Sequence, residues 1–106
     1  MTSRAEEAGT VPSFRLDGRF AVITGASEGI GWGVARAYAR SGARLLLAAR
    51  REDRLKRLAG LIADEGGHAD ILVTDVTRIA DLKRLGDRAA ELSADGALPL
   101  ILVNNA

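Results

Sequence analysis

The chain has 106 residues, of which 47% are hydrophobic and 27% are charged, so a single globular domain is the default class. Cysteine is absent and His68 is the one histidine, which excludes disulfides, thiolate metal sites and a site built from several histidines. With a formal net charge of +1 and no run of the roughly 18 apolar residues that a membrane-spanning helix needs, we expect a cytoplasmic protein that binds neither nucleic acid, membrane nor metal.

The chain opens with a polar lead and then enters its first strand. Residues 1–13 contain two glutamates and no apolar core, so they are not a secretory signal and are expected to be disordered ahead of a domain over residues 14–106. Residues 19–24 form a short apolar run with β-branched side chains behind the turn-forming pair Asp17-Gly18, which predicts the first strand.

A helix is predicted over residues 30–40, directly after the first strand and its turn. Its apolar positions recur at helical spacing, at Ile30, Val34, Ala37 and Tyr38. Gly42 is a natural left-handed residue to end this helix. The continuous apolar run over residues 43–49 predicts a second strand that is covered on both faces.

The second helix is predicted between this strand and the pair Gly66-Gly67, which ends it. Its apolar stripe consists of Leu55, Leu58, Ala59 and Ile62. Its basic side chains are expected to form a solvated face at Arg54, Lys56 and Arg57. Residues 68–76 alternate between apolar and polar side chains and include β-branched residues, which predicts the third strand.

A third helix and a fourth strand follow. The helix is expected to begin at a capping Thr77. Its apolar positions are Ile79, Leu82, Leu85 and Ala89. Residues 98–103 form the fourth strand-like run. Helices of this length return the chain across the sheet, so the strands are parallel, and right-handed crossovers place the helices on both faces. We therefore expect half of a doubly wound α/β sheet, with about four strands in the order 3-2-1-4 and three helices.

The turn after the first strand, TGASEGIG, contains three glycines within seven residues. In a doubly wound sheet, ligands bind at the carboxyl ends of the strands, where this turn lies. Gly25 permits a tight turn, Gly29 leaves room for a bulky anion, and Gly31 lets the helix pack close to the sheet. The start of the helix offers N–H groups and a partial positive charge, which suit a pyrophosphate. An ordinary tight turn is the alternative, whereas a phosphate loop is excluded because no lysine follows the glycines.

Residues 24–31 match T-G-x-x-x-G-x-G, the cofactor motif of the short-chain dehydrogenases/reductases. The chain also resembles this family in LDGRFAVITGA before the motif, in Asp75-Val76, and in NNA at residues 104–106, which is similar to the start of N-N-A-G. The resemblance runs from Phe14 to the last residue. It implies an incomplete Rossmann-like fold and an oxidoreductase that reduces carbonyls or oxidises alcohols by hydride transfer, with a dinucleotide and a small-molecule substrate as its ligands.

The resemblance also implies which residues bind the cofactor. Those lining the pyrophosphate and adenosine would be Gly25, Ser27, Glu28, Gly29 and Ile30. The carboxylate of Asp75 would contact the adenine amino group while Val76 packs against the ring, although a plain turn residue is the alternative for Asp75. Asn105 and Ala106 would lie near the nicotinamide ribose.

The end of the second strand bears on the choice between NAD and NADP. An acid there would bind the ribose 2′-hydroxyl of NAD, but the position holds Ala49, and Arg50 follows where NADP-preferring members often have a basic residue. A guanidinium can bind a phosphate through two parallel hydrogen bonds, and Arg51 either helps or is only solvated. Glu28 argues the other way, since it either repels the 2′-phosphate or is neutralised by Arg50. NADP is therefore the expected cofactor, with NAD as the alternative.

No catalytic residue is assigned within this chain. Members of the family use a tyrosine as acid/base, a lysine four residues later that lowers its pKa, and a serine that polarises the substrate oxygen. The one tyrosine, Tyr38, is followed four residues later by Gly42. Because the family places its catalytic residues after N-N-A-G, we expect the cofactor-binding portion of a longer homo-oligomeric enzyme, inactive alone and prone to self-association.

Three other functions fit the pattern less well. A non-catalytic nucleotide-binding or interaction module of the same fold is the main alternative, and a downstream reading frame with Y-x-x-x-K would argue against it. A methyltransferase that uses S-adenosylmethionine usually has an acidic, denser glycine pattern at the first turn. A nucleic-acid binder is least expected, because the basic cluster over residues 49–57 contains acids and lacks an aromatic platform.

Overall fold

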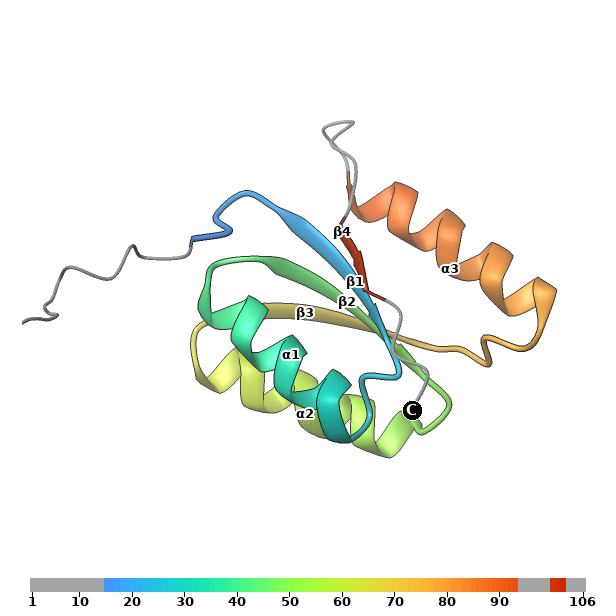
Figure 1. Cartoon of the computed structure of the whole chain (residues 1–106), viewed down its shortest axis with the longest axis horizontal. Coiled ribbons are helices and arrows are strands. Elements are labelled where there is room, and N and C mark those ends of the chain that lie inside the picture. Colours follow the sequence, from blue (N-terminus) through green and yellow to red (C-terminus); the bar gives the residue numbers. More distant parts are fainter. Residues whose placement is uncertain (1–14, 94–99, 103–106) are drawn as a thin grey trace, which may run out of the picture.

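A computed structural model of the chain describes residues 15–93 and 100–102, and the predicted lead over residues 1–13 lies outside this part. Within the described residues, one sheet of four parallel strands has the order β3-β2-β1-β4, and three helices cover its faces (Figure 1). The elements in chain order are β1 (Phe20–Thr24), α1 (Gly29–Arg40), β2 (Arg44–Ala49), α2 (Glu52–Asp64), β3 (His68–Val73), α3 (Ile79–Leu92) and β4 (Leu100–Leu102). The α/β fold class expected from the sequence is confirmed.

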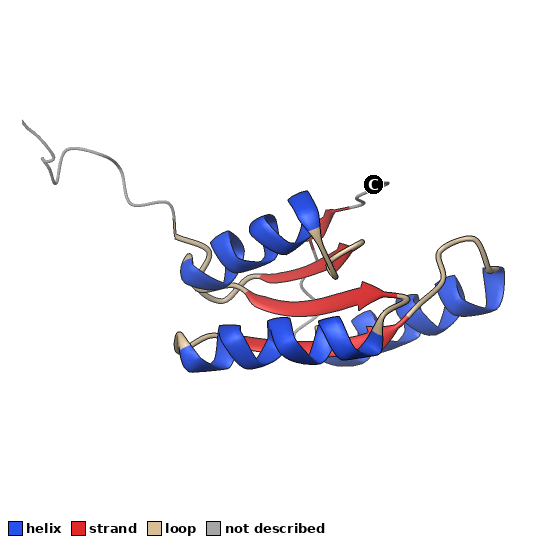
Figure 2. Ribbon diagram, turned by 90° about the horizontal axis from the view of Figure 1, so that it is seen from below, coloured by secondary structure: helices blue, strands red, loops and turns tan. Residues whose placement is uncertain are grey.

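The parallel register brings the ends of the strands to one edge of the sheet. β1 pairs with β2 up to Thr24↔Ala48, and β2 pairs with β3 up to Ala49↔Val73, while β4 lies on the other side of β1. The strands therefore run in one direction, as Figure 2 shows, and the loops after β1, β2 and β3 begin at the same edge. We call this edge the carboxyl end of the sheet and the opposite edge its amino end.

Side chains that alternate along the strands build a core on each face of the sheet. The larger core lies under α1 and α2, which Figure 1 shows on one side of the sheet. Its strand and α2 residues include Ala21, Ile23, Leu45, Leu47, Leu55, Leu58 and Ile62. The smaller core lies under α3 and consists of Phe20, Val22, Leu46, Ala48, Leu85 and Ala89. Burial of both faces explains why β1 and β2 are apolar runs rather than alternating sequences.

The two helices on the larger core differ in how well their buried faces could be predicted. The stripe predicted for α2 is confirmed, because its large members are fully buried and Ala59 is partly buried against them. The stripe predicted for α1 is confirmed only at Val34 and Tyr38, which pack partly buried against the same core. Its buried face consists of Gly31, Ala35 and Ala39, whereas Ile30 is 75% exposed. Small residues face the sheet there, which lets α1 approach it closely.

The region from β3 to α3 also departs from the prediction. β3 ends at Val73, three residues early. The N–H of Thr74 still donates to the carbonyl of Ala49 at 2.8 Å, whereas the N–H of Asp75 donates to Asp81 Oδ2 at 2.8 Å. Thr77 does not cap α3, which has Arg78 at its N-cap position and no side-chain cap. The predicted stripe is also incomplete, since Ile79 is 85% exposed. Figures 1 and 2 show the reason: the first turns of α3 extend past the ends of the strands.

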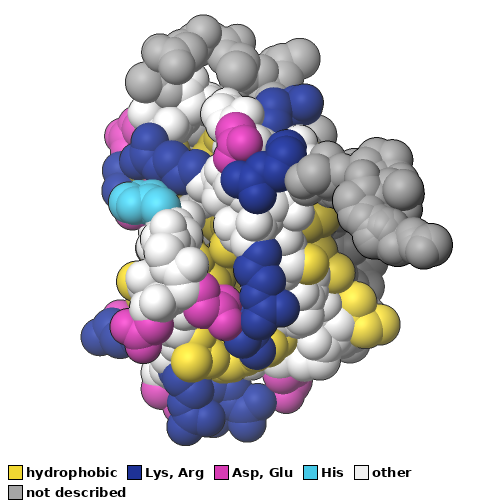
Figure 3. Space-filling view, turned by 90° about the vertical axis from the view of Figure 1, so that its left-hand side faces the viewer, with side chains coloured by type: hydrophobic (Ala, Val, Ile, Leu, Met, Phe, Trp, Pro, Cys, Tyr) yellow, Lys and Arg dark blue, Asp and Glu magenta, His cyan; other side chains and the backbone are white. Residues whose placement is uncertain are grey.

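The amino end of the sheet is closed by hydrogen bonds and ion pairs. The N–H of Arg44 donates to the carbonyl of Arg19 at 2.9 Å. Glu65 Oε2 accepts from Nη2 of Arg36 at 2.6 Å and from Nη2 of Arg40 at 3.1 Å, so α1 is tied to the end of α2. These hydrogen bonds lower the pKa of Glu65 from its ordinary value. Figure 3 shows this end of the molecule, with basic and acidic side chains interspersed near the single histidine.

Candidate cofactor-binding site

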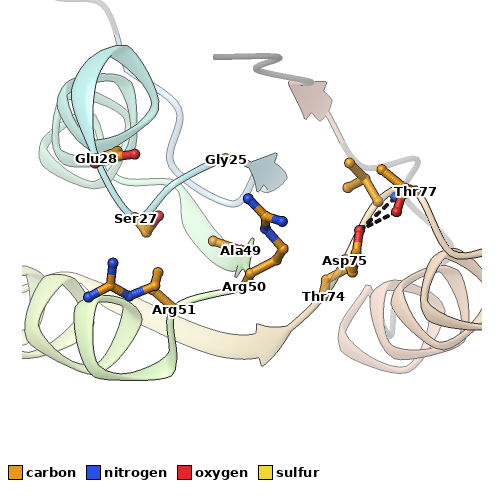
Figure 4. Close-up of a pocket in the computed structure, with 10 residues that line it drawn as sticks. Gly25, Ser27, Glu28, Ala49, Arg50, Arg51, Thr74, Asp75 and Thr77 are labelled. Atoms are coloured by element: carbon orange, nitrogen blue, oxygen red, sulfur yellow. Dashed lines mark hydrogen bonds between the residues drawn. The ribbon is translucent and has the colours of Figure 1, made fainter.

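A hollow of about 600 Å³ lies at the carboxyl end of the sheet (Figure 4). Its lining residues are Gly25, Ser27, Glu28, Ala49, Arg50, Arg51, Thr74, Asp75, Val76 and Thr77. They come from three loops that lie far apart in the sequence, after β1, β2 and β3. The parallel register brings these loops together, and ligands of doubly wound sheets bind at this edge. Seven of the predicted site residues therefore share one hollow: Gly25, Ser27, Glu28, Arg50, Arg51, Asp75 and Val76.

The turn after β1 has the backbone conformation that its glycines allow. Gly25 and Gly29 have φ angles of +64° and +60°, in the left-handed region that favours glycine. The N–H of Ala26 donates to the carbonyl of Ala48 at 3.3 Å, which ties the turn to β2. A Cβ atom on Gly29 would meet no atom within 4 Å, so the space in front of this residue is open. The conformation, rather than crowding, requires glycine at this position.

The start of α1 faces the same end of the sheet. Glu28 is the N-cap residue, but its side chain makes no capping hydrogen bond, and no acidic residue lies in the first turn. The partial positive charge of the helix N-terminus is therefore not offset by a side-chain cap. Gly31 lies on the buried face of α1 and Ile30 on its exposed surface, and neither lines the hollow.

Two arginines follow the buried end of β2. In Figure 4 the side chain of Arg50 rises between the β1 loop and the β3 loop, whereas Arg51 extends to the other side, below Ser27. Arg51 pairs with Asp53, with Nε and Oδ1 3.6 Å apart. Within the part of the chain that the structure describes, Arg50 makes no ion pair. Its guanidinium is thus available to an anion in the hollow.

The loop after β3 presents a carboxylate to the hollow. Oδ1 of Asp75 accepts a hydrogen bond from the hydroxyl of Thr77 at 2.6 Å and another from the N–H of Thr77 at 3.0 Å. These bonds, with a smaller contribution from the charges of Arg50 and Arg78, lower the pKa of Asp75 from its ordinary value. At neutral pH the group is therefore an ionised hydrogen-bond acceptor.

Two residues that the sequence analysis did not single out hold this loop in place. Asp81 accepts from the backbone of Asp75, and its other oxygen lies 3.3 Å from Nη1 of Arg84. Nη2 of Arg84 donates to the carbonyl of Val73 at 2.9 Å. The sequence did contain a pattern that indicates this pair: an acid in the first turn of a predicted helix, followed by a basic residue three positions later.

Glu28 has a different partner from the one considered in the sequence analysis. Its Oε2 accepts from Nη1 of Arg54 at 2.9 Å, so the carboxylate is neutralised by α2 and not by Arg50. Arg54 is partly exposed, as expected for a solvated helix face, and it also pairs with Glu28 because α2 lies beside the start of α1. The spacing of residues in the sequence could not predict this ion pair, because the two residues are 26 positions apart.

The remaining predicted features lie elsewhere. Asn105 and Ala106 lie outside the described residues. Tyr38 is partly buried against the core under α1 and α2, as a packing residue would be. Over residues 15–93 and 100–102, no cluster of three or more His, Cys, Asp or Glu residues could hold a metal ion. None of the helices in this part has the length and apolar character needed to cross a membrane.

Known proteins resemble this chain in sequence and in fold. Residues 19–106 match the short chain dehydrogenase family. A short chain dehydrogenase of Pseudocercospora fijiensis is 39% identical over 90 residues, which cover 85% of this chain and 28% of the relative. The hydroxysteroid dehydrogenase structure from Escherichia coli gives a TM-score of 0.82 at 31% identity, covering 89% of this chain and 39% of that chain.

A metagenomic short-chain oxidoreductase, solved in complex with NADP, gives a TM-score of 0.77 at 33% identity, covering 86% of this chain and 40% of that chain. The chain spans about a third or less of the length of the curated relatives it matches. The residues that match the family model, 19–106, include the strands and loops that form the hollow described above.

Proposed function

The chain belongs to the short-chain dehydrogenase family, and on this basis we propose that residues 14–106 form the NADP-binding portion of an oxidoreductase. The whole protein would interconvert a carbonyl and an alcohol by hydride transfer, for which the bound dinucleotide supplies or accepts the hydride. The residues of this chain bind and orient the adenosine and pyrophosphate of that cofactor. The observation that supports the proposal is the hollow at the carboxyl end of the sheet, where the glycine turn, Arg50 and Asp75 meet.

Each wall of the hollow suits one part of the cofactor. The glycine turn and the uncapped start of α1 suit the pyrophosphate, because backbone N–H groups and the helix dipole both favour an anion. Asp75 is an ionised acceptor and suits the adenine amino group. Val76 is partly exposed beside it and offers an apolar surface to the ring. Asn105 and Ala106 are proposed to approach the nicotinamide ribose.

The preference for NADP rests on the end of β2. Ala49 is buried and has no side-chain acceptor for the ribose 2′-hydroxyl of NAD, whereas Arg50 points into the hollow. A guanidinium without an ion-pair partner among the described residues can bind a 2′-phosphate without first losing another contact. Neutralisation of Glu28 by Arg54 also removes the main argument against NADP.

Titration of the chain with NADPH and with NADH tests this proposal. The fluorescence of Trp32, the single tryptophan, and a shift of the unfolding temperature report binding independently of turnover. We expect both dinucleotides to bind and NADPH to bind more tightly. Tighter binding of NADH would contradict the NADP preference, and binding of neither would contradict the cofactor site itself.

The chain is expected to bind the cofactor without reducing a carbonyl compound. Its one tyrosine, Tyr38, is partly buried against the core, with Gly42 rather than lysine four residues later. An assay of NADPH oxidation with a range of aldehydes and ketones checks this expectation. Turnover above the rate without protein would show that a different residue of this chain performs the proton transfer.

A further inference from the structure

The ion pair between Glu28 and Arg54 joins the cofactor turn to a neighbouring helix. Glu28 is the N-cap residue of α1 and lines the hollow, while Arg54 lies at the start of α2. Their side chains meet at 2.9 Å, although both remain partly exposed to solvent. The pair therefore sets the charge of the glycine turn at the place where we propose that the cofactor binds.

A second hollow of about 470 Å³ lies between the start of α1 and the first turns of α2. Its lining residues are Ser27, Glu28, Gly29, Trp32, Arg51, Asp53, Arg54 and Arg57. Ser27, Glu28 and Arg51 line both hollows, so the second continues from the first. Three arginines and two acids line it, so its lining carries one more positive than negative charge.

Each of the two acids has a basic neighbour. Asp53 lies 3.6 Å from Arg51 and Glu28 lies 2.9 Å from Arg54. Of these two acids only Glu28 lines both hollows, so its charge, together with that of Asp75, faces a phosphate placed near Arg50. Charges a few ångströms apart interact appreciably even near a protein surface, and a phosphate monoester is close to doubly charged at neutral pH.

We propose that Arg54 is a specificity-determining residue, which admits the 2′-phosphate of NADP by neutralising Glu28. This inference rests on the proposed function of the hollow. Arg54 acts through Glu28 as a positioning residue: it holds the carboxylate against α2 and cancels its charge. Without Arg54, the acid in the glycine turn opposes a phosphate on the 2′-oxygen far more than it opposes a hydroxyl, so the chain shifts toward NAD.

The test uses two ligands that differ only in the phosphate at issue, adenosine 5′-monophosphate and adenosine 2′,5′-bisphosphate. Isothermal titration calorimetry measures the dissociation constant of each with the full chain. For Arg54→Gln we expect about a 10-fold weaker affinity for the bisphosphate and at most about a threefold weaker affinity for the monophosphate. Arg54→Lys keeps the charge and is expected to stay within about threefold of the unchanged chain for both ligands.

The double variant Glu28→Gln/Arg54→Gln removes both charges and is expected to restore the bisphosphate affinity to within about twofold. Glu28→Gln alone leaves Arg54 free and is expected to tighten bisphosphate binding, which tests the inference even if Arg54→Gln does not fold. Arg57→Gln is the matched control: it removes an arginine from the same hollow, with no ion pair in the described part of the chain, and should change either affinity less than about twofold.

The outcomes separate this inference from the proposed function. If the unchanged chain binds neither adenosine ligand, the cofactor site and the inference both fail. If it binds both, and Arg54→Gln weakens bisphosphate binding no more than Arg57→Gln does, the cofactor site stands and the role of Arg54 is refuted. A loss of bisphosphate affinity in Arg54→Gln that Glu28→Gln does not repair also refutes the role, because it shows that Arg54 does not act through Glu28.

Discussion

The two ends of the sheet use glycine and charge in opposite ways. At the amino end, a Cβ on Gly67 would lie 2.8 Å from Cγ2 of the buried Ile62, so glycine is needed because neighbouring atoms crowd it. At the carboxyl end, a Cβ on Gly29 would meet nothing within 4 Å. The charged groups follow the same division. Glu65 is paired with two arginines at the amino end, whereas Arg50 faces a hollow at the carboxyl end.

This contrast separates residues that maintain the fold from residues that bind a ligand. The charged groups at the amino end pair with one another, so their loss should lower stability and leave cofactor affinity unchanged. Groups at the carboxyl end face open space, so their loss should lower affinity and change stability little. Variants at the two ends can therefore be compared by measuring unfolding and cofactor binding on the same protein.

The largest effect is expected from Gly67→Val at the amino end. The added side chain would overlap with the buried Ile62, and overpacking of this kind costs about 1–3 kcal/mol of the free energy of unfolding. Chemical denaturation measures the loss, and NADPH affinity of the folded fraction should be unchanged. Gly60→Ala is the matched control. Gly60 is an exposed residue in the middle of α2, where a Cβ would meet no atom within 4 Å, and alanine favours helix more than glycine does. This variant should therefore stabilise the chain by up to about 1 kcal/mol.

Arg50→Ala tests the carboxyl end. We expect about a 10-fold to 30-fold weaker affinity for NADPH, because a charge-assisted hydrogen bond to phosphate is lost, and less than about a threefold change for NADH. The midpoint of unfolding without cofactor should stay the same, since Arg50 makes no ion pair within the described residues. An equal loss of affinity for NADPH and for NADH would show that Arg50 does not bind the 2′-phosphate.

Asp75→Asn is expected to weaken the affinities for NADPH and for NADH by the same factor, about threefold to 10-fold, because both cofactors have the adenine group. The hydrogen bonds from Thr77 place the pKa of Asp75 below its ordinary value of 3.8. The carboxylate therefore stays ionised as pH falls from 8 to about 5, and affinity should not change through this group in that range. A change in the NADPH-to-NADH ratio, or a loss of affinity already near pH 6, would contradict this role.

The smallest effect is expected from Glu65→Gln, which removes the acceptor shared by Arg36 and Arg40. Folding lowers the pKa of Glu65, so its contribution to stability is present above its ordinary pKa of 4.5 and is lost as pH falls through the lower folded value. The variant should melt a few degrees below the unchanged chain at pH 7, and the difference should vanish in acid. Glu91→Gln, which removes an exposed pair with Arg88 on α3, should change the melting temperature less.

The parts of the fold that could be predicted depend on large apolar side chains and on glycine. The buried stripe of α2 was evident because Leu55, Leu58 and Ile62 stand at helical spacing. The buried face of α1 is predictable only in part: the glycine motif indicates that Gly31 packs against the sheet, but the spacing of large apolar residues does not reveal the small Ala35 and Ala39. Ile79 was placed in a core because nothing in the sequence says that α3 starts beyond the strands.

The candidate site shows the same division. The glycine turn, Arg50 and Asp75 could be placed together from the sequence, because the ends of parallel strands share one edge of a sheet. The contacts of Arg54 with Glu28 could not, because they depend on how closely the first turns of α1 and α2 approach one another. A charged helix face that the sequence predicts to be solvated can therefore still provide an ion-pair partner for a residue of the site.

Backbone amide chemical shifts measured by NMR during a titration with NADPH test the central claim most directly, because they report both ends of the sheet at once. We expect the amides of the glycine turn and of Asp75 to shift as the cofactor binds, while those of Gly67 and its neighbours stay in place. Shifts that avoid the glycine turn, or that spread equally to the amino end, would contradict the assignment of the carboxyl-end hollow as the cofactor site.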